Sequence, residues 1–174
     1  MEFRKNDIVT LEIVDCGTDG EGIGKADGFT VFVKDAVIGD TVTAKIMKAK
    51  KNYGYGRLME ILNASPYRVE PVCPSARQCG GCQLQAVSYE EQKVFKEKKL
   101  RGHLERIGGF TNLPMEPLIG MDEPYHYRNK AQFPVGRNKE GKIVAGFMLD
   151  VHTLLLKTVT VRLESQRIKM YLTV

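Results

Sequence analysis

The sequence contains no long apolar run and few cysteines, and both shortages exclude whole classes of protein. No stretch approaches the roughly 20 apolar residues of a membrane-spanning helix, and residues 1–7 have no apolar signal region. We therefore expect a cytoplasmic protein without membrane contact. In that reducing compartment the 4 cysteines indicate metal binding before disulfide bonds.

A dinucleotide-binding fold is also not indicated. The glycines of residues 19–25 do not form the G-x-G-x-x-G pattern, and the stretch that follows them reads as a strand rather than a helix. We predict a glycine-rich hairpin there, in which the backbone approaches a ligand or another strand. The βαβ pattern in which thiol oxidoreductases place their C-x-x-C motif is likewise missing.

The composition describes an ordinary folded chain with a mild basic excess. Its 174 residues suffice for one large or two small domains, and its 43% hydrophobic content is usual for a folded protein. Lys and Arg number 26 against 21 acidic residues, so the net charge is +5. This excess favours polyanionic partners without specifying one.

Cys73, Cys79 and Cys82 form the pattern C-x5-C-x2-C, so three of the 4 cysteines lie within ten residues. Closely spaced thiolates hold iron or zinc, and the two glycines between the last two cysteines let backbone N–H groups turn toward the sulfurs. A redox dithiol of Cys79 and Cys82 and a chance clustering of buried cysteines are the alternatives. A fourth thiolate is missing, because Cys16 lies far upstream. In a zinc site, His103, His126 or His152 would complete a Cys3His set.

Short β-branched segments dominate the first 70 residues. We predict strands at 8–14, 29–33, 41–47 and 58–62, separated by turn residues. Strands this short and closely spaced indicate a small closed or half-closed barrel.

A stretch between two of these strands interleaves cations with aromatic residues. Either it is a solvated hairpin, or its cations meet phosphates while its tyrosines stack on bases. The candidate RNA-binding residues are Lys48, Lys50, Lys51, Tyr53, Tyr55 and Arg57.

Four motifs, at residues 20–24, 29–33, 37–42 and 65–69, resemble the TRAM domain, an OB-like β-barrel that binds RNA. The segment C-P-x4-C-G-G-C-Q-L-Q follows directly. In this order the two modules resemble the N-terminal part of the bacterial 23S rRNA (uracil-5-)-methyltransferases of the RumA/RlmD-like type. The resemblance implies ribosomal RNA as partner, a [4Fe–4S] cluster on Cys73, Cys79 and Cys82, and S-adenosylmethionine as methyl donor in the full-length family.

The second half predicts one helix and a hairpin. Ser88 and Glu91 form a capping box, so a helix should run over 89–107, with an apolar stripe of Phe95, Leu100, Leu104 and Ile107. Residues 125–135, predicted as a strand, resemble the family's Tyr-Arg-Asn-Lys segment and add Arg128 and Lys130 as RNA-binding candidates. A hairpin turn at 138–141 should then lead into a strand over 142–148.

The resemblance ends near residue 153, where the family continues to a fourth cysteine. A frameshift near Leu155 would explain why this cysteine is missing and why 157–174 match nothing in the family.

We expect a mainly β fold of three parts: a TRAM-like barrel (1–70), a small cysteine-ligated α+β domain (71–156) and the tail. The family's S-adenosylmethionine-binding domain and catalytic cysteine find no counterpart. We therefore assign no catalytic residue and expect an RNA-binding monomer, without DNA as partner, that is inactive alone.

Overall fold

The structure is a computed structural model, and it describes residues 3–128, 134–138, 140–149 and 152–157. The chain divides into two compact units. The first comprises residues 1–70 and 83–110, and the second comprises 71–82 and 111–174. Residues 83–110 therefore pack with the barrel, whereas the sequence-based division groups them with the cysteine segment.

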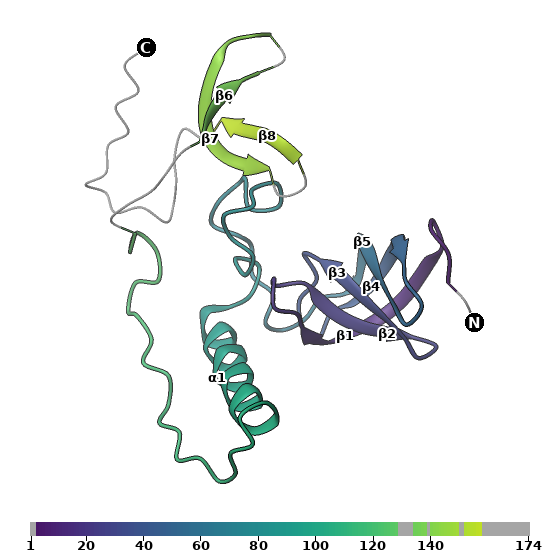
Figure 1. The fold of residues 1–174 in the computed structure, drawn as a ribbon, viewed down its shortest axis with the longest axis vertical. Coiled ribbons are helices and arrows are strands. Elements are labelled where there is room, and N and C mark those ends of the chain that lie inside the picture. Colours follow the sequence, from purple (N-terminus) through teal and green to yellow (C-terminus); the bar gives the residue numbers. More distant parts are fainter. Residues whose placement is uncertain (1–2, 129–133, 139, 150–151, 158–174) are drawn as a thin grey trace. The chain divides into compact units, whose positions relative to one another are not determined.

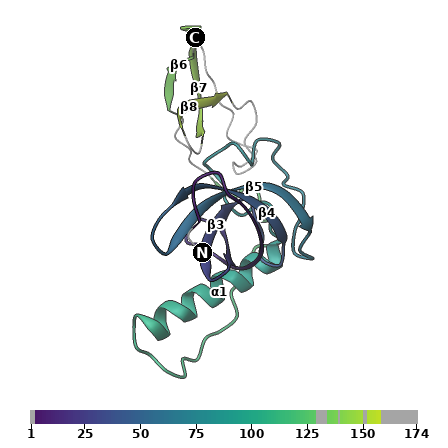
Figure 2. The same ribbon diagram turned by 90° about the vertical axis from the view of Figure 1, so that its right-hand side faces the viewer.

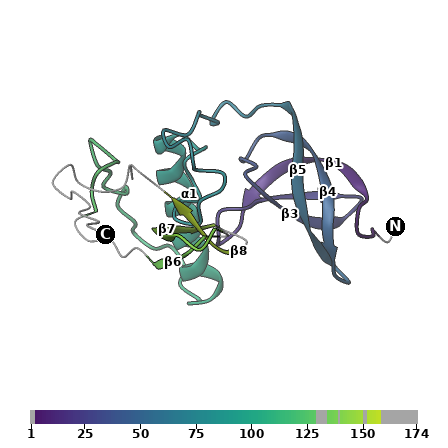
Figure 3. The same ribbon diagram turned by 90° about the horizontal axis from the view of Figure 1, so that it is seen from above.

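The predicted barrel is confirmed as a closed ring of five strands in the order β1-β2-β3-β5-β4 (Figures 1 and 2). All neighbouring pairs are antiparallel except β3 and β5, which run parallel. Figure 3 shows the same strands from another direction. The strands are β1 (Ile8–Cys16), β2 (Gly22–Ala26), β3 (Phe29–Lys34), β4 (Thr41–Ala49) and β5 (Tyr53–Asn63).

Strict alternation along the strands builds the barrel core. Val42, Ala44 and Ile46 of β4 are fully buried, as are Val31 and Val33 of β3. Their neighbours in sequence point outward, because successive side chains of a strand lie on opposite faces. Many of the β-branched residues in the predicted strands therefore form the interior, whereas Ile8 and Val14 of β1 are exposed.

Strand β5 starts at Tyr53, well before the strand predicted from Leu58. Two glycines explain the difference, since glycine is a weak strand former. At Gly56 an added Cβ would lie 3.0 Å from a methyl group of Val31 and 3.2 Å from Ala44. The core therefore needs glycine at this point of the strand.

Asp40 links the barrel to the segment that follows it. Its carboxylate is completely buried and accepts hydrogen bonds from the backbone N–H groups of Val37 (2.7 Å) and Ser65 (2.8 Å). The Arg68 guanidinium adds two more, and it also donates to the Asp35 carbonyl at 2.8 Å. Two motifs of the TRAM resemblance, 37–42 and 65–69, thus meet at one buried ion pair.

The same segment leads to helix α1 (Tyr89–Arg106). Val69 donates to the Ala86 carbonyl (2.9 Å), and Ser88 donates to the Tyr67 carbonyl (2.8 Å). The predicted cap is confirmed, because the Ser88 hydroxyl accepts from the Glu91 N–H at 3.4 Å.

The apolar stripe of α1 contains no fully buried residue. Leu100 is 52% exposed, and Ile107, which lies just past the end of the helix, is 81% exposed. Cations interrupt the stripe at every turn, which leaves no continuous apolar face.

In the second unit, strands β6 (Val135–Arg137), β7 (Ile143–Leu149) and β8 (His152–Lys157) form an antiparallel sheet. The predicted hairpin is confirmed, since the N–H groups of Asn138 and Gly141 close the turn between β6 and β7. The strand predicted at 125–135 is wrong over its first residues: Tyr125 lies in a bend, and His126 has a φ of +58°. No helix in the described part of the chain combines the length and the apolar character that crossing a bilayer requires.

Candidate RNA-binding face

Three aromatic rings cluster on the outer surface of β3 and β5. The ring centroid of Phe32 lies 5.6 Å from that of Tyr55 and 5.8 Å from that of Tyr53, and the two tyrosine centroids are 5.8 Å apart. Tyr53 stands edge-on to both other rings. We call this cluster of Phe32, Tyr53 and Tyr55 the aromatic face.

Strand register explains why these rings meet. In the parallel pairing of β3 and β5, Phe32 lies opposite Tyr55. Tyr53 and Tyr55 both point outward because the intervening Gly54 and the following Gly56 occupy inward positions. Both tyrosines remain exposed, at 37% and 42%. Exposed aromatic rings on a strand surface are suited to stacking on nucleic-acid bases.

A row of cations crosses the sheet beside the aromatic face. Arg57 of β5 lies between Lys34 of β3 and Lys45 of β4 in the strand register, and Lys48 lies opposite Tyr55. Like charges placed directly opposite each other destabilise a sheet, so folding alone does not favour this arrangement. Within the described residues, Lys45, Lys48 and Arg57 form no ion pair. A polyanion would neutralise them.

The Tyr55 hydroxyl stays protonated at neutral pH. The adjacent Tyr53 raises the pKa of Tyr55 above its ordinary value of 10, helped by desolvation and by the carboxylates of Glu21 and Asp19. A neutral phenol does not repel phosphate groups. The pairing of Ile23 with Phe32 places the start of β2, and with it the acidic loop before this strand, beside the aromatic face.

The structure brings most of the predicted RNA-binding residues together. Lys50 and Lys51 are exposed where β4 turns into β5, next to Lys48, Tyr53, Tyr55 and Arg57. Arg128 is half-buried in the second unit, and Lys130 lies outside the described residues. Sequence reasoning missed Phe32, although its place between buried Val31 and Val33 marks it as an outward-facing residue.

The cysteine segment is a series of turns in the second unit. Cys79 donates its N–H to the Ser75 carbonyl (2.9 Å), and the Gly81 N–H lies 3.3 Å from the Cys79 sulfur. The predicted approach of a glycine N–H to a sulfur is thus present. Three thiols and an N–H···S contact suit a metal–thiolate site in donor type. The described residues nevertheless contain no group of three potential ligands close enough to hold a metal ion, so the sulfurs are not gathered.

Cys16 lies in the first unit and Cys82 in the second, and their surroundings differ. Burial raises the pKa of the Cys16 thiol to about 11, and Asp15 and Glu21 add to the shift, so this thiol stays protonated in the barrel unit. In the second unit, burial raises the pKa of Tyr125, with contributions from Cys82 and Glu123. Tyr125 therefore belongs to the surroundings of Cys82.

Comparison with known proteins agrees with this geometry. Residues 3–59 match the TRAM domain. Proteins named uncharacterized RNA methyltransferase from Halalkalibacterium halodurans and Bacillus cereus are 50% and 46% identical over 144 residues, which is 83% of this chain and 31% of each relative. The chain thus spans about a third of their length.

A solved structure extends the match to the fold. Pyrococcus abyssi tRNA (uracil-54, C5)-methyltransferase, in complex with S-adenosyl-L-homocysteine, aligns with a TM-score of 0.58 over 90% of this chain and 33% of its own, at 22% identity. The likeness shows a shared fold. The predicted resemblance is therefore confirmed for the TRAM domain and for its likeness to RNA methyltransferases: residues 3–59 match that domain, and 83% of this chain is similar to proteins of that name.

Proposed function

We propose that this chain is the RNA-holding part of an S-adenosylmethionine-dependent 23S rRNA uridine-5 methyltransferase. The observation that carries the proposal is the aromatic face with its row of cations on a TRAM barrel. Rings offer bases a stacking surface, and the cations offer the backbone a positive track. No residue of this chain is assigned a role in methyl transfer.

Salt dependence tests the proposed RNA contact. We expect the full chain to bind single-stranded RNA with an affinity that falls linearly on a log–log plot against salt concentration, because cations on the protein displace counterions from phosphates. Lys48→Gln and Arg57→Gln should each reduce the slope by about 0.7, the value of one lost phosphate contact. Fluorescence anisotropy with a labelled oligonucleotide measures both.

Lys142→Gln provides the control, since this lysine is exposed, pairs with Glu140 and lies in the second unit. Its slope should equal that of the unaltered chain. Binding that ignores salt, or a slope that changes equally in all three variants, would refute the assignment of phosphates to the face.

We further propose that Cys73, Cys79 and Cys82 hold a [4Fe–4S] cluster whose role is to fix the shape of a segment with little apolar content. Metal ligation can order a segment whose side chains do not form a packed core. The N–H contact to the Cys79 sulfur supports the proposal, because such contacts tune cluster thiolates.

Anaerobic reconstitution with ferrous iron and sulfide should give a brown chain that absorbs visible light and bleaches in air, since three thiolates leave one iron exposed. Serine at all three positions should abolish the absorption, whereas Cys16→Ser should preserve it. A colourless chain with one zinc per molecule would contradict the cluster and favour a Cys3His zinc site instead.

A further inference from the structure

A polar crevice lies in the first unit between the loop after β1 and the start of α1. Its volume is about 210 Å³. The lining residues are Thr18, Asp19, Gly20, Gln83, Leu84 and Phe95. None of them belongs to the residues predicted to contact RNA.

The walls of the crevice are held by contacts between the loop and the helix. The Lys99 ammonium lies 3.5 Å from the Thr18 carbonyl and 5.5 Å from the centroid of the Phe95 ring. Gly20 has a φ of +86°, and a Cβ there would come within 2.6 Å of the Gln83 Cβ. The loop thus lies directly against the chain that enters α1.

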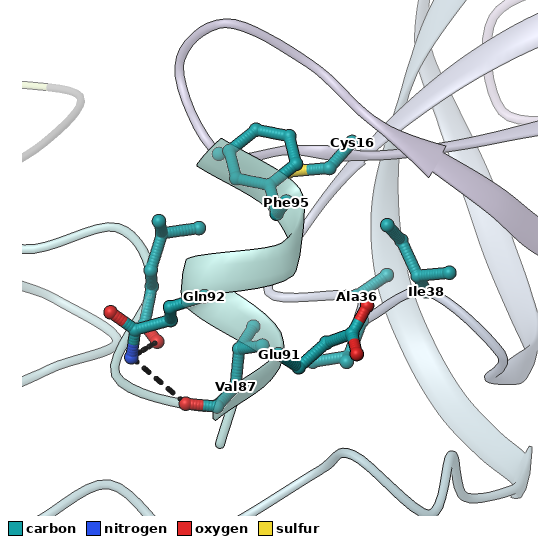
Figure 4. A pocket seen from close by; sticks show the side chains of 10 residues that line it. Cys16, Ala36, Ile38, Val87, Glu91, Gln92 and Phe95 are labelled. Atoms are coloured by element: carbon teal, nitrogen blue, oxygen red, sulfur yellow. Dashed lines mark hydrogen bonds between the residues drawn. The ribbon is translucent and has the colours of Figure 1, made fainter. Parts of the chain in front are cut away.

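The lining combines a hydrogen-bonding rim with an apolar interior. Asp19 supplies only acceptors, whereas the Gln83 amide supplies both donors and an acceptor. Leu84 and Phe95 continue into an adjoining apolar cavity beside Cys16, Ala36 and Ile38 (Figure 4). The crevice is smaller than the roughly 300–1,000 Å³ clefts that take drug-sized ligands. A single planar ring with a polar edge suits this size and chemistry.

The crevice also lies near the aromatic face. Asp19 is one of its walls and belongs to the loop before β2, and Ile23 of β2 pairs with Phe32 of the aromatic face. The loop that forms one wall of the crevice therefore leads directly into the strand beside the aromatic face.

We propose that this crevice receives one unpaired nucleobase with an exocyclic amino group, from the RNA strand held on the aromatic face. The inference rests on the proposed RNA binding and adds base selectivity to it. The Asp19 carboxylate accepts from the amino group, as carboxylates do from cytosine N4, and Gln83 contacts the remaining edge. Uracil presents a carbonyl oxygen in place of that amino group, which the carboxylate repels.

Oligocytidylate and oligouridylate of equal length isolate this difference, because the two pyrimidines are alike in size. The full chain should bind the cytidine oligomer at least about fivefold more tightly, the lower limit for a good base contact. Asp19→Ala and Gln83→Ala should each reduce the ratio to below about twofold. Both residues are exposed, so neither change should alter thermal unfolding.

Glu12→Ala removes an equal charge from an exposed position of β1 outside the crevice and should preserve the ratio. Equal affinity for the two oligomers, with binding still dependent on the tyrosines, would overturn the crevice and leave the RNA-binding face intact. A ratio that survives Asp19→Ala would also overturn it. Absence of any RNA binding would overturn both proposals.

Discussion

Replacing Tyr53 and Tyr55 together by alanine is expected to lower the affinity for single-stranded RNA at least about 30-fold. Each base stacked on an aromatic side chain contributes about 1–3 kcal/mol, so losing two stacks costs about 2–6 kcal/mol. Fluorescence anisotropy with the full chain measures the change. Both side chains are exposed, so the barrel core is not disturbed.

Conservative variants separate stacking from hydrogen bonding. The Tyr53→Phe and Tyr55→Phe double variant keeps both rings and should remain within about threefold of the unaltered chain, because stacking needs only the π-face. Phe32→Ala should weaken RNA binding more than Tyr53→Ala or Tyr55→Ala alone, since the Phe32 ring contacts both tyrosine rings. A loss with phenylalanine as large as with alanine would contradict the stacking role.

Tyr67 supplies the matched control. It is 44% exposed in the same unit but belongs to no strand of the barrel and contacts none of the three rings. Tyr67→Ala should leave RNA affinity nearly unchanged. Equal losses at Tyr67 and at Tyr53 would mean that the RNA follows another surface.

The segments predicted as strands at 8–14, 29–33 and 41–47 lie within β1, β3 and β4. Alternation along β4 places Val42, Ala44 and Ile46 on the buried face, because side-chain period and burial coincide there. In β1 the apolar run also includes Ile8 and Val14, which are exposed. The start of β5 was not predicted, because its inward positions are Gly54 and Gly56, which carry no apolar side chain. Only the surrounding barrel makes those glycines favourable.

The capping box located the start of α1 to the residue, because a cap is a local interaction between Ser88 and Glu91. The sequence does not say how far the apolar stripe is covered, since spacing alone does not identify the partner that packs on it. Leu100 and Ile107 remain exposed in the structure.

The residues of the candidate RNA-binding face were also predicted only in part. Residues 48–57 are contiguous, so their mixture of cations and rings is visible in the sequence. Phe32 joins them through the register of β3 on β5, and the crevice joins Asp19 to Gln83 across distant segments. Such contacts depend on the closed barrel and on where α1 packs, which no local pattern encodes.

Asp40→Asn is expected to destabilise the chain by about 3–5 kcal/mol, the usual cost of removing one partner from a buried ion pair. The variant leaves the Arg68 charge without its counterion beside the buried barrel end. It also weakens the acceptors for the Val37 and Ser65 N–H groups, which hold the turn before β4 and the end of the barrel together. Chemical denaturation monitored by circular dichroism measures the loss.

The same carboxylate predicts how acid affects stability. Burial alone would raise its pKa, but hydrogen bonds from Arg68, Ser65 and Val37 outweigh burial and hold the pKa of Asp40 below its ordinary value. The unfolded chain therefore takes up this proton at a higher pH than the folded chain. The contribution is complete above the ordinary pKa of about 3.9 and is lost as the pH falls through the lowered one.

Asp40→Asn should remove that part of the acid dependence, whereas Glu105→Gln should leave it. Glu105 pairs with Arg101 on the exposed surface of α1, where an ion pair contributes about 0–1 kcal/mol. If both variants destabilise the chain equally, Asp40 is not the junction that joins the barrel to the segment leading into α1. If Asp40→Asn is costly and flattens the acid limb, the buried pair connects the two motifs that first marked the barrel, 37–42 and 65–69.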